Sequence, residues 1–267
     1  MDVIYFNTAS PNLEIRVYSM QCLVEITRCY YDFLDDQMAM ILEKTITHME
    51  KDDEKVGIQA YELWCSLSDE ENARIREKEH GVPNINVYKY SQIASDHLLK
   101  MIIYHLMNRK KNEGDEWTLS KAASSLISNL SQCCEYEFIT KVVSFVGENL
   151  SHTDPKIRDS SILAFTSILE TRYKDHIREI TMNALDSILN MMNDSNKEVK
   201  ESTSWCIEKI CEFHTYAFLK DANKFDKLYS AILNNLAKGR KIGVHLCNSL
   251  HYIAKSIKIE DNKTSIY

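Results

Sequence analysis

One pattern of apolar residues occurs six times along the 267-residue chain, and it limits the possible folds more than any other feature of the sequence. In each copy, apolar or small residues stand 4, 7, 8 and 11 positions after the first residue of the set. These spacings lie on one side of an α-helix. The residue four positions on is mostly small, which lets a neighbouring helix approach closely. The pattern predicts six amphipathic helices of one kind, which begin near Ile15, Val56, Leu119, Ile157, Val199 and Ile242.

The six copies follow one another at intervals of 41, 63, 38, 42 and 43 residues. Four of these intervals lie near the roughly 40 to 47 residues of HEAT and armadillo repeats. Apolar segments such as 139–150 and 177–188 fall between the stripes and predict one partner helix for each. Two helices per repeat, with no proline-kinked third helix, favour HEAT. The long interval predicts an insertion of about 20 residues within 68–90.

The predicted fold class is therefore all-α, an α-α superhelix of HEAT type with about six antiparallel helix pairs. We expect a single solenoid over 1–267, with repeats at about 1–33, 34–90, 91–134, 135–172, 173–217 and 218–260. A HEAT repeat buries its apolar stripe only when a neighbour stacks on it. The opening residues 3–6 resemble the end of a helix, so we expect a piece of a longer array. Asp154 and Asp194 are predicted helix N-caps.

Composition argues against several classes of protein. The net charge is -7, and no basic face of the kind that binds nucleic acid is visible. No apolar run is long enough to cross a bilayer, so we expect no membrane insertion. The eight cysteines form no CxxC motif, which favours a reducing compartment.

Motifs for catalysis are absent from the sequence. There is no HExxH, no Cys/His spacing for a metal, no glycine-rich phosphate loop and no GxSxG. No nucleophile and base can be paired from their spacing. We therefore expect no enzyme, no catalytic residue, no metal site and no cofactor.

Seven segments, in order along nearly the whole chain, resemble one family. They are QCLVEITRCYYDFLDDQM (21–38), YELWCSLSDEE (61–71), GDEWTLSKAA (114–123), CCEYEFITKVVSFVGENL (133–150), DPKIRDSSILAFTSILE (154–170), ESTSWCIEKICE (201–212) and GVHLCNSLHYIAKS (243–256). The chain resembles importin-β, the karyopherin-β family of nuclear transport receptors. The resemblance covers a central stretch, well under half of the receptor.

The resemblance implies a set of partners. In this family the second helix of each repeat lines a concave groove, which binds the basic importin-β-binding segment of an importin-α adaptor or a basic cargo signal. Ran-GTP releases that segment. Phe-Gly nucleoporins dock on the first helices, here around Ile41, Thr45 and Ile46, where we expect an incomplete site. The protein would shuttle between cytoplasm and nucleus through the pore.

Three residues are predicted to contact the basic segment in the groove. Glu62 and Trp205 both stand six positions after the first residue of their sets, off the apolar stripe, so we expect them to be exposed. Asp69 begins the acidic cluster after the second stripe. The resemblance implies that all three bind the adaptor. By contrast, Trp64 lies on the stripe and is predicted core, and Asn248 stands where the family has a further groove tryptophan.

An acidic loop is the last feature that the resemblance assigns. Trp117 follows Glu113, Asp115 and Glu116, and it is similar to the tryptophan after the family's acidic loop. The resemblance implies that the three acids and Trp117 contact the adaptor and Ran. The loop departs from the family pattern, because three basic residues at 109–111 precede it and its acids are fewer.

Two other functions remain open from the sequence. A HEAT-repeat scaffold, such as a phosphatase subunit, would bind folded subunits through its loops and need no groove tryptophan. A karyopherin could also bind its cargo directly, without an adaptor.

Overall fold

The computed structural model describes the backbone of residues 1–110 and 116–264, with side chains as far as 258. Within these residues the secondary structure is helical and contains no strand. Twelve α-helices follow one another in pairs, and the second helix of each pair carries the apolar stripe. The predicted all-α fold of HEAT-type helix pairs is confirmed. We call the stripe-bearing helices B helices and their partners A helices.

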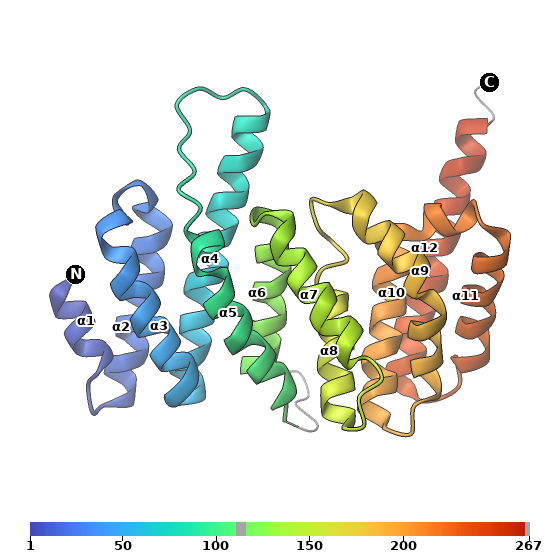
Figure 1. Ribbon diagram of the computed structural model, residues 1–267, viewed down its shortest axis with the longest axis horizontal. Coiled ribbons are helices and arrows are strands. Elements are labelled where there is room, and N and C mark those ends of the chain that lie inside the picture. Colours follow the sequence, from blue (N-terminus) through green and yellow to red (C-terminus); the bar gives the residue numbers. More distant parts are fainter. Residues whose placement is uncertain (111–115, 265–267) are drawn as a thin grey trace. The chain divides into compact units, whose positions relative to one another are not determined.

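The chain divides into two compact units, Met1–Lys141 and Val142–Tyr267. In the first unit, the A helices are α1 (Asp2–Thr8), α3 (Met38–Lys51) and α5 (Tyr90–Met107). Its B helices are α2 (Leu13–Cys29), α4 (Glu54–Glu79) and α6 (Leu119–Cys133). Two short 3₁₀ turns, η1 (Tyr31–Phe33) and η2 (Asp35–Gln37), precede α3. Each A helix packs on its B helix, and α4 packs on both α2 and α6 (Figure 1).

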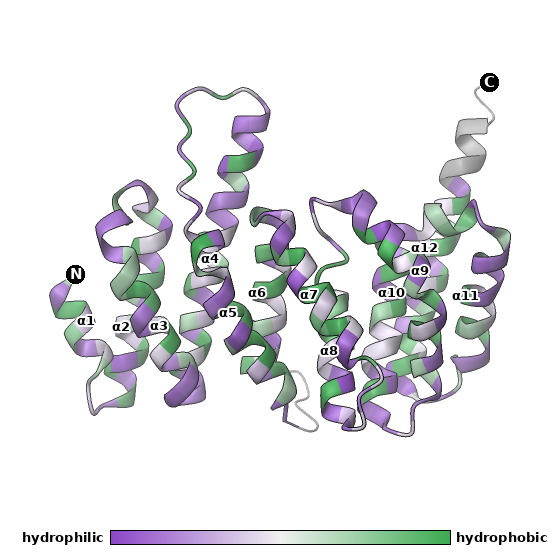
Figure 2. Ribbon diagram, in the orientation of Figure 1, coloured by the Kyte–Doolittle hydropathy of each residue, from purple (hydrophilic) through white to green (hydrophobic). Residues whose placement is uncertain are grey.

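The second unit repeats this arrangement. The boundary lies within α7 (Tyr136–Asn149), which is followed by α8 (Pro155–Ser167) and α9 (Lys174–Asn190). After the turn η3 (Met191–Asn193) come α10 (Lys197–Leu219), α11 (Ala222–Asn235) and α12 (Arg240–Thr264). The B helix α10 packs on α8 and on α12. Along these helices hydrophobic residues recur among hydrophilic ones, as in amphipathic helices (Figure 2).

The apolar stripe forms the core that the spacing predicted, with one exception. In α4 and α10 all five stripe positions are buried, and Trp64 is 0% exposed. In α2 the prediction is wrong at two positions, because Ile15 is 43% exposed and Cys22 is also exposed. Helix α2 packs against α1 and α4, and it buries Met20 and Val24 instead. Which side of a helix is covered depends on its neighbours.

The predicted insertion is half helix and half loop. Helix α4 continues to Glu79, and residues 80–89 then return to α5 (Figure 1). Glu71, which is 1% exposed, accepts hydrogen bonds from Tyr31 Oη at 3.0 Å and from the backbone N–H of Ser91 at 3.2 Å. The Tyr31 oxygen accepts the N–H of Tyr88 at 2.8 Å. Burial raises the pKa of Glu71. This network attaches the insertion to η1 and to the start of α5.

One of the two predicted N-caps is confirmed and the other is wrong. Asp154 caps α8 by accepting the N–H of Lys156 at 2.9 Å. Helix α10 is capped by Asn196, which accepts the N–H of Val199 at 3.1 Å. Asp194 lies two residues earlier, where its carboxylate binds an arginine side chain instead.

The same arginine–aspartate contact occurs once in each unit. Arg16 binds Asp52 with Nη2 at 2.8 Å, and Arg158 binds Asp194 with Nε at 2.7 Å. Each arginine is 36 residues before its aspartate, and thus reaches from a B helix to the turn before the next B helix. In α4 the residue equivalent to these two arginines is Gly57. A Cβ at this position would stand 2.9 Å from Leu119 Cδ2. There the close approach of α6 replaces the ion pair.

We expect Arg158→Ala to lower the free energy of unfolding by about 2 kcal/mol. The change leaves Asp194, whose side chain is 9% exposed, without its bidentate partner. Urea unfolding followed by circular dichroism measures the effect. Arg178→Ala is the control, because its pair with Asp175 is exposed, and we expect a loss of less than about 0.5 kcal/mol. Equal losses in the two variants would contradict a special role for the Arg158 contact.

No helix among the described residues combines the length and the apolar character that a bilayer span needs.

Candidate protein-binding faces of the B helices

Two of the predicted groove residues share one side of α4. Glu62 and Asp69 are both exposed and lie two helical turns apart, about 10 Å along the axis. Between them is buried Cys65, whose backbone oxygen accepts a hydrogen bond from Asn129 Nδ2 of α6 at 3.3 Å. Asn129 also forms a hydrogen bond with the Asp69 side chain. We call this surface, made of Glu62, Asp69 and Asn129, the α4 face.

The electrostatics of the α4 face follow from its partial burial. Burial raises the pKa of Asp69, while Arg76 and the hydrogen bond from Asn129 act in the opposite direction. The pKa of the Cys65 thiol is raised, chiefly by burial and further by the two carboxylates. Neither Glu62 nor Asp69 forms an ion pair with the described residues. The face therefore presents carboxylates that an external cation can reach.

Trp117 lies at the other end of these helices. It is 55% exposed and directly precedes Thr118, the N-cap of α6. Glu54 at the start of α4 binds Lys110 and accepts the backbone N–H of Leu119 at 3.3 Å, so it holds both ends of the intervening loop. The hydrogen bond from Lys110 lowers the pKa of Glu54. Asp69 lies fifteen residues beyond Glu54, roughly 20 Å along α4, so Trp117 and Asp69 form no single cluster.

The acidic loop is described only at its end. Glu116 is exposed, and its backbone oxygen accepts a hydrogen bond from Lys121 Nζ at 2.5 Å. The predicted site residues Glu113 and Asp115 lie outside the described residues.

Trp205 is half-buried on α10 in the second unit. Helical spacing places it on one side of α10 with residues 201, 208, 209, 212 and 216. We call this surface the α10 face. Unlike Trp205, Trp64 is fully buried and donates its indole N–H to Thr45 Oγ1 at 2.9 Å. The different exposures expected for these two tryptophans are confirmed.

A network that the sequence did not reveal joins the α10 face to α12. Buried Glu208 is bound by His245 Nδ1 and accepts a hydrogen bond from Asn248 Nδ2 at 3.0 Å. Burial alone would raise the pKa of Glu208, but the hydrogen bonds from His245 and Asn248 outweigh it, so the pKa is lowered. Asn248, at the position of the family's further groove tryptophan, thus links two helices. The spacing of 37 to 40 residues between these groups gave no local signal.

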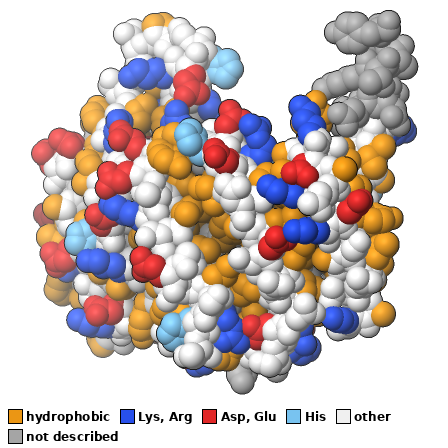
Figure 3. Space-filling model, turned by 45° about the vertical axis from the view of Figure 1, so that its right-hand side comes forward, with side chains coloured by type: hydrophobic (Ala, Val, Ile, Leu, Met, Phe, Trp, Pro, Cys, Tyr) orange, Lys and Arg blue, Asp and Glu red, His pale blue; other side chains and the backbone are white. Residues whose placement is uncertain are grey.

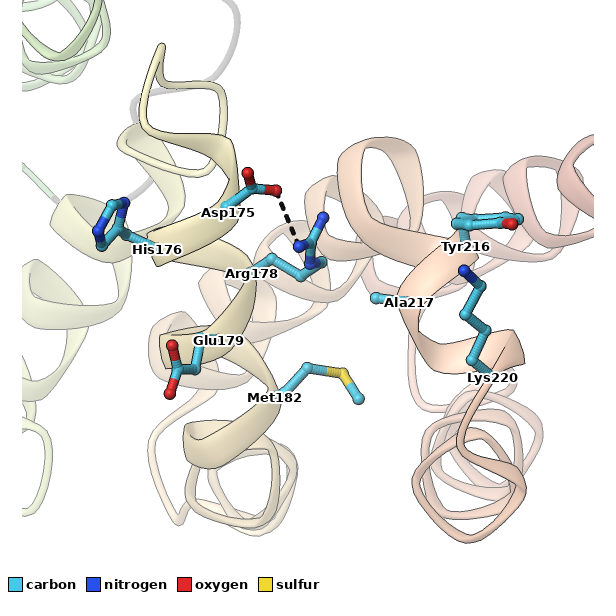
Figure 4. Close-up of a pocket in the computed structure, with 8 residues that line it drawn as sticks. All are labelled: Asp175, His176, Arg178, Glu179, Met182, Tyr216, Ala217 and Lys220. Atoms are coloured by element: carbon cyan, nitrogen blue, oxygen red, sulfur yellow. Dashed lines mark ion pairs between the residues drawn. The ribbon is translucent and has the colours of Figure 1, made fainter.

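A pocket of about 600 Å³ lies between α9 and α10 in the second unit (Figure 4). Met182 of α9 and Ala217 of α10 point into the space between the two helices. On its rim Arg178 is paired with Asp175 at 2.8 Å, and Lys220 Nζ is 4.2 Å from the centre of the Tyr216 ring. None of the site residues predicted from the sequence lines this pocket.

The expected nucleoporin contacts on α3 need correction. Ile41 and Thr45 are both fully buried, and the Thr45 hydroxyl is used by Trp64. Helix α3 packs on α4 through these residues, so of the three expected residues only Ile46 is partly exposed. On α5, by contrast, Ile93 and Tyr104 are exposed. A surface formed by the A helices of this unit would have to use such residues.

The described residues hold no group of three or more His, Cys, Asp or Glu side chains placed to bind a metal ion. On the face drawn in Figure 3, acidic and basic side chains are interspersed with hydrophobic ones, and neither sign dominates a broad area. The described arrangement presents exposed carboxylates on α4 and a half-buried aromatic ring on α10.

Comparison with known proteins agrees with this architecture. The family model for the HEAT repeat matches residues 184–214. Importin subunit beta-1 of Arabidopsis thaliana is 27% identical over 267 residues, which cover 96% of this chain and 31% of that protein. Importin subunit beta-1 of Schizosaccharomyces pombe is 26% identical over 274 residues, covering 100% of this chain and 32% of that protein. The chain spans about a third of the length of these curated relatives.

Solved structures show the same fold. A crystal structure of importin-β matches with a TM-score of 0.87 and 24% identity, over 96% of this chain and 30% of that one. Kap95p, described with RanGDP, and a Kap95:Nup1 complex match with TM-scores of 0.86 and 0.85, each at 24% identity and with the same coverage. The resemblance to importin-β that the seven sequence segments indicated is confirmed.

Proposed function

We propose, from the premise that this chain is a HEAT-repeat segment of karyopherin-β type, that it serves a nuclear transport receptor by capturing basic helical segments on its B helices. The partner is the basic importin-β-binding region of an importin-α adaptor, or a basic cargo signal. Ran-GTP controls its release, and the receptor shuttles between cytoplasm and nucleus. The chain acts by binding and needs no catalysis or cofactor.

One observation carries the proposal: Glu62 and Asp69 are exposed on one side of α4 and form no ion pair with the described residues. Their separation of about 10 Å equals two helical turns. A helix that lies along α4 with lysine or arginine seven residues apart matches both carboxylates. Charge-assisted hydrogen bonds to such side chains are stronger than neutral ones.

Trp205 supplies the second kind of contact. Its half-buried ring offers an apolar surface to the methylene stem of a lysine or arginine, and its π-face attracts the cationic group. Tryptophan is enriched among the residues that contribute most to binding energy at interfaces.

The Ran and nucleoporin partners are proposed from relatives. The matched Kap95 structures are described with RanGDP and with Nup1. Within this chain, Glu116 and Trp117 are the described residues that we assign to the loop that contacts the adaptor and Ran. We assign nucleoporin contact to exposed apolar residues of the A helices, such as Ile93.

We expect the chain to bind a basic, importin-β-binding-type peptide in isothermal titration at low salt, and more weakly at high salt, because exposed ion pairs are screened. Trp205→Ala should cost about 2 kcal/mol of binding free energy, near a thirtyfold loss of affinity. Tyr229→Ala, which alters a partly exposed aromatic on the A helix α11, is the matched control and should leave affinity unchanged.

Absence of binding at low salt would refute the proposal. Equal losses in the Trp205 and Tyr229 variants would remove the specific role of the α10 face. Binding of folded subunits that is unaffected by Trp205→Ala would favour a HEAT-repeat scaffold. A pull-down that retains basic cargo but no adaptor would indicate direct cargo binding.

A further inference from the structure

We propose that Lys209 acts as an internal competitor on the α10 face, and that the α4 face therefore takes the most basic part of the partner. This inference rests on the function proposed above. It adds which of the two faces, α4 or α10, selects a basic segment of the partner. The partner it describes is a helical segment with clustered lysine or arginine against α4.

The two faces can be compared position by position, because both helices carry the same repeat. Asp69 of α4 and Glu212 of α10 stand thirteen residues after Val56 and Val199, respectively, at equivalent places. One turn earlier, α4 has Ser66 where α10 has Lys209. Residues three apart are neighbours on a helix surface, so only the carboxylate of α10 has a lysine beside it.

The contacts agree with this difference. Lys209 Nζ lies 2.6 Å from Glu212 Oε2, and both side chains are partly exposed. The same ammonium is 5.5 Å from the centre of the Phe213 ring, and Glu212 also shares a hydrogen bond with Tyr252. Asp69, by contrast, forms no ion pair with the described residues: Arg76 attracts it without a salt bridge, and its hydrogen bond comes from the neutral amide of Asn129. The carboxylate on α4 thus keeps its charge available, and the one on α10 is neutralised within the chain.

The remaining acids of the α10 face are also paired. Glu201 lies 3.3 Å from Lys197 Nζ and 3.6 Å from Lys241 Nζ, while Glu208 is held by His245 and Asn248. A lysine that approaches this face must displace a group that already binds the acid, so it exchanges one contact for another and gains little. On the α4 face the same lysine forms a new pair.

Two reciprocal substitutions test the inference with a basic helical peptide as the probe. Lys209→Ser gives α10 the residue of α4, and Ser66→Lys gives α4 the residue of α10. We expect the first to tighten binding about two- to fivefold at low salt and the second to weaken it by a similar factor. A peptide of equal length with glutamine in place of lysine and arginine should not distinguish the variants. Circular dichroism confirms that both fold.

A second readout needs no peptide. In a Trp117→Phe background, Trp205 is the one tryptophan with solvent exposure, because Trp64 is fully buried. Lys209→Ser should increase quenching of its fluorescence by caesium ions and decrease quenching by iodide, since the freed Glu212 attracts cations and repels anions.

The outcomes separate the two proposals. Peptide binding by the wild type, with affinity and quenching unchanged in both variants, overturns the role of Lys209 and leaves the proposed function in place. No binding in any variant, together with shifted caesium and iodide quenching, overturns the proposed function while the charge effect of Lys209 stands. Opposite affinity changes in the two variants support the inference.

Discussion

Replacing Trp64 with alanine is expected to lower the free energy of unfolding by about 4 kcal/mol. The side chain is fully buried on the α4 stripe, at the centre of the first unit. Its removal loses the burial of a large aromatic group and leaves a cavity that the surrounding helices fill only in part. Urea unfolding followed by circular dichroism measures the change.

Two further substitutions separate the causes. Trp64→Phe keeps most of the volume but loses the hydrogen bond to Thr45, whose hydroxyl still donates to the Ile41 carbonyl at 2.8 Å. We expect a loss of about 1 to 2 kcal/mol. Trp117→Ala, at an exposed position, should change stability by less than about 0.5 kcal/mol. A loss at Trp117 as large as that at Trp64 would contradict the assignment of Trp64 to the core.

The second large effect is a loss of stability in mild acid, caused by His214 in α10. Its buried ring interacts through Nε2 with the Leu169 carbonyl at 3.2 Å. Burial lowers the pKa of His214 to about 4, with Arg178 and Lys174 acting in the same direction and the hydrogen bond to Leu169 opposing them. In the unfolded chain a histidine titrates near 6.5. Between these values the unfolded state binds more protons than the folded one.

The sign of the pH dependence follows from that difference. The contribution of neutral His214 to the free energy of unfolding is fully present above about pH 6.5. It is lost progressively as the pH falls toward 4, for a total of roughly 3 kcal/mol. Urea unfolding at several pH values in this window measures it. In the first unit the pKa of His105 is also lowered, chiefly by burial, so the wild type should lose somewhat more.

Variants isolate the histidine responsible. His214→Gln should flatten the dependence, whereas His251→Gln, which alters an exposed residue of α12, should leave it unchanged. Measurements above about pH 4.5 avoid Asp194, whose pKa the Arg158 hydrogen bond lowers, whereas the raised pKa values of Glu71 and Asp69 act in the opposite direction to His214. An unaltered slope in His214→Gln would rule out this histidine as the source.

The helices and their buried sides were largely predictable from the sequence. Apolar spacing is a property of each helix by itself, so the five stripe positions of α4 and of α10 were identified without knowledge of any neighbour. Apolar spacing does not determine the buried side where the neighbouring helices differ. Ile15 and Cys22 carry the stripe pattern, yet both are exposed, because the buried side of α2 is shifted toward Met20 and Val24. Asp194 has the residue type of a cap, but an arginine 36 residues away binds it.

For the candidate binding residues, too, the repeat position predicted exposure but not the partners of the side chains. The repeat position alone indicated that Glu62 and Trp205 lie off the apolar stripe, and both are at least partly exposed. Their role in binding stays a prediction. The partners of the acids on the α10 face could not be predicted, because His245 and Asn248 reach Glu208 from another helix. The pocket between α9 and α10 likewise depends on two helices whose facing residues share no local pattern.

The sequence by itself thus determined that this chain forms paired amphipathic helices, and which side of most of them is buried, because the 3.6-residue period of the α-helix is local. Only the tertiary structure decided which charged groups remain available. Asp69 of α4 and Glu212 of α10 occupy equivalent repeat positions. Glu212 is paired with Lys209 and shares a hydrogen bond with Tyr252 of α12, whereas Asp69 forms no ion pair with the described residues and meets the attraction of Arg76 and the amide of Asn129. Charge pairing depends on distances in space, and residues about 40 positions apart become neighbours only when the helices stack.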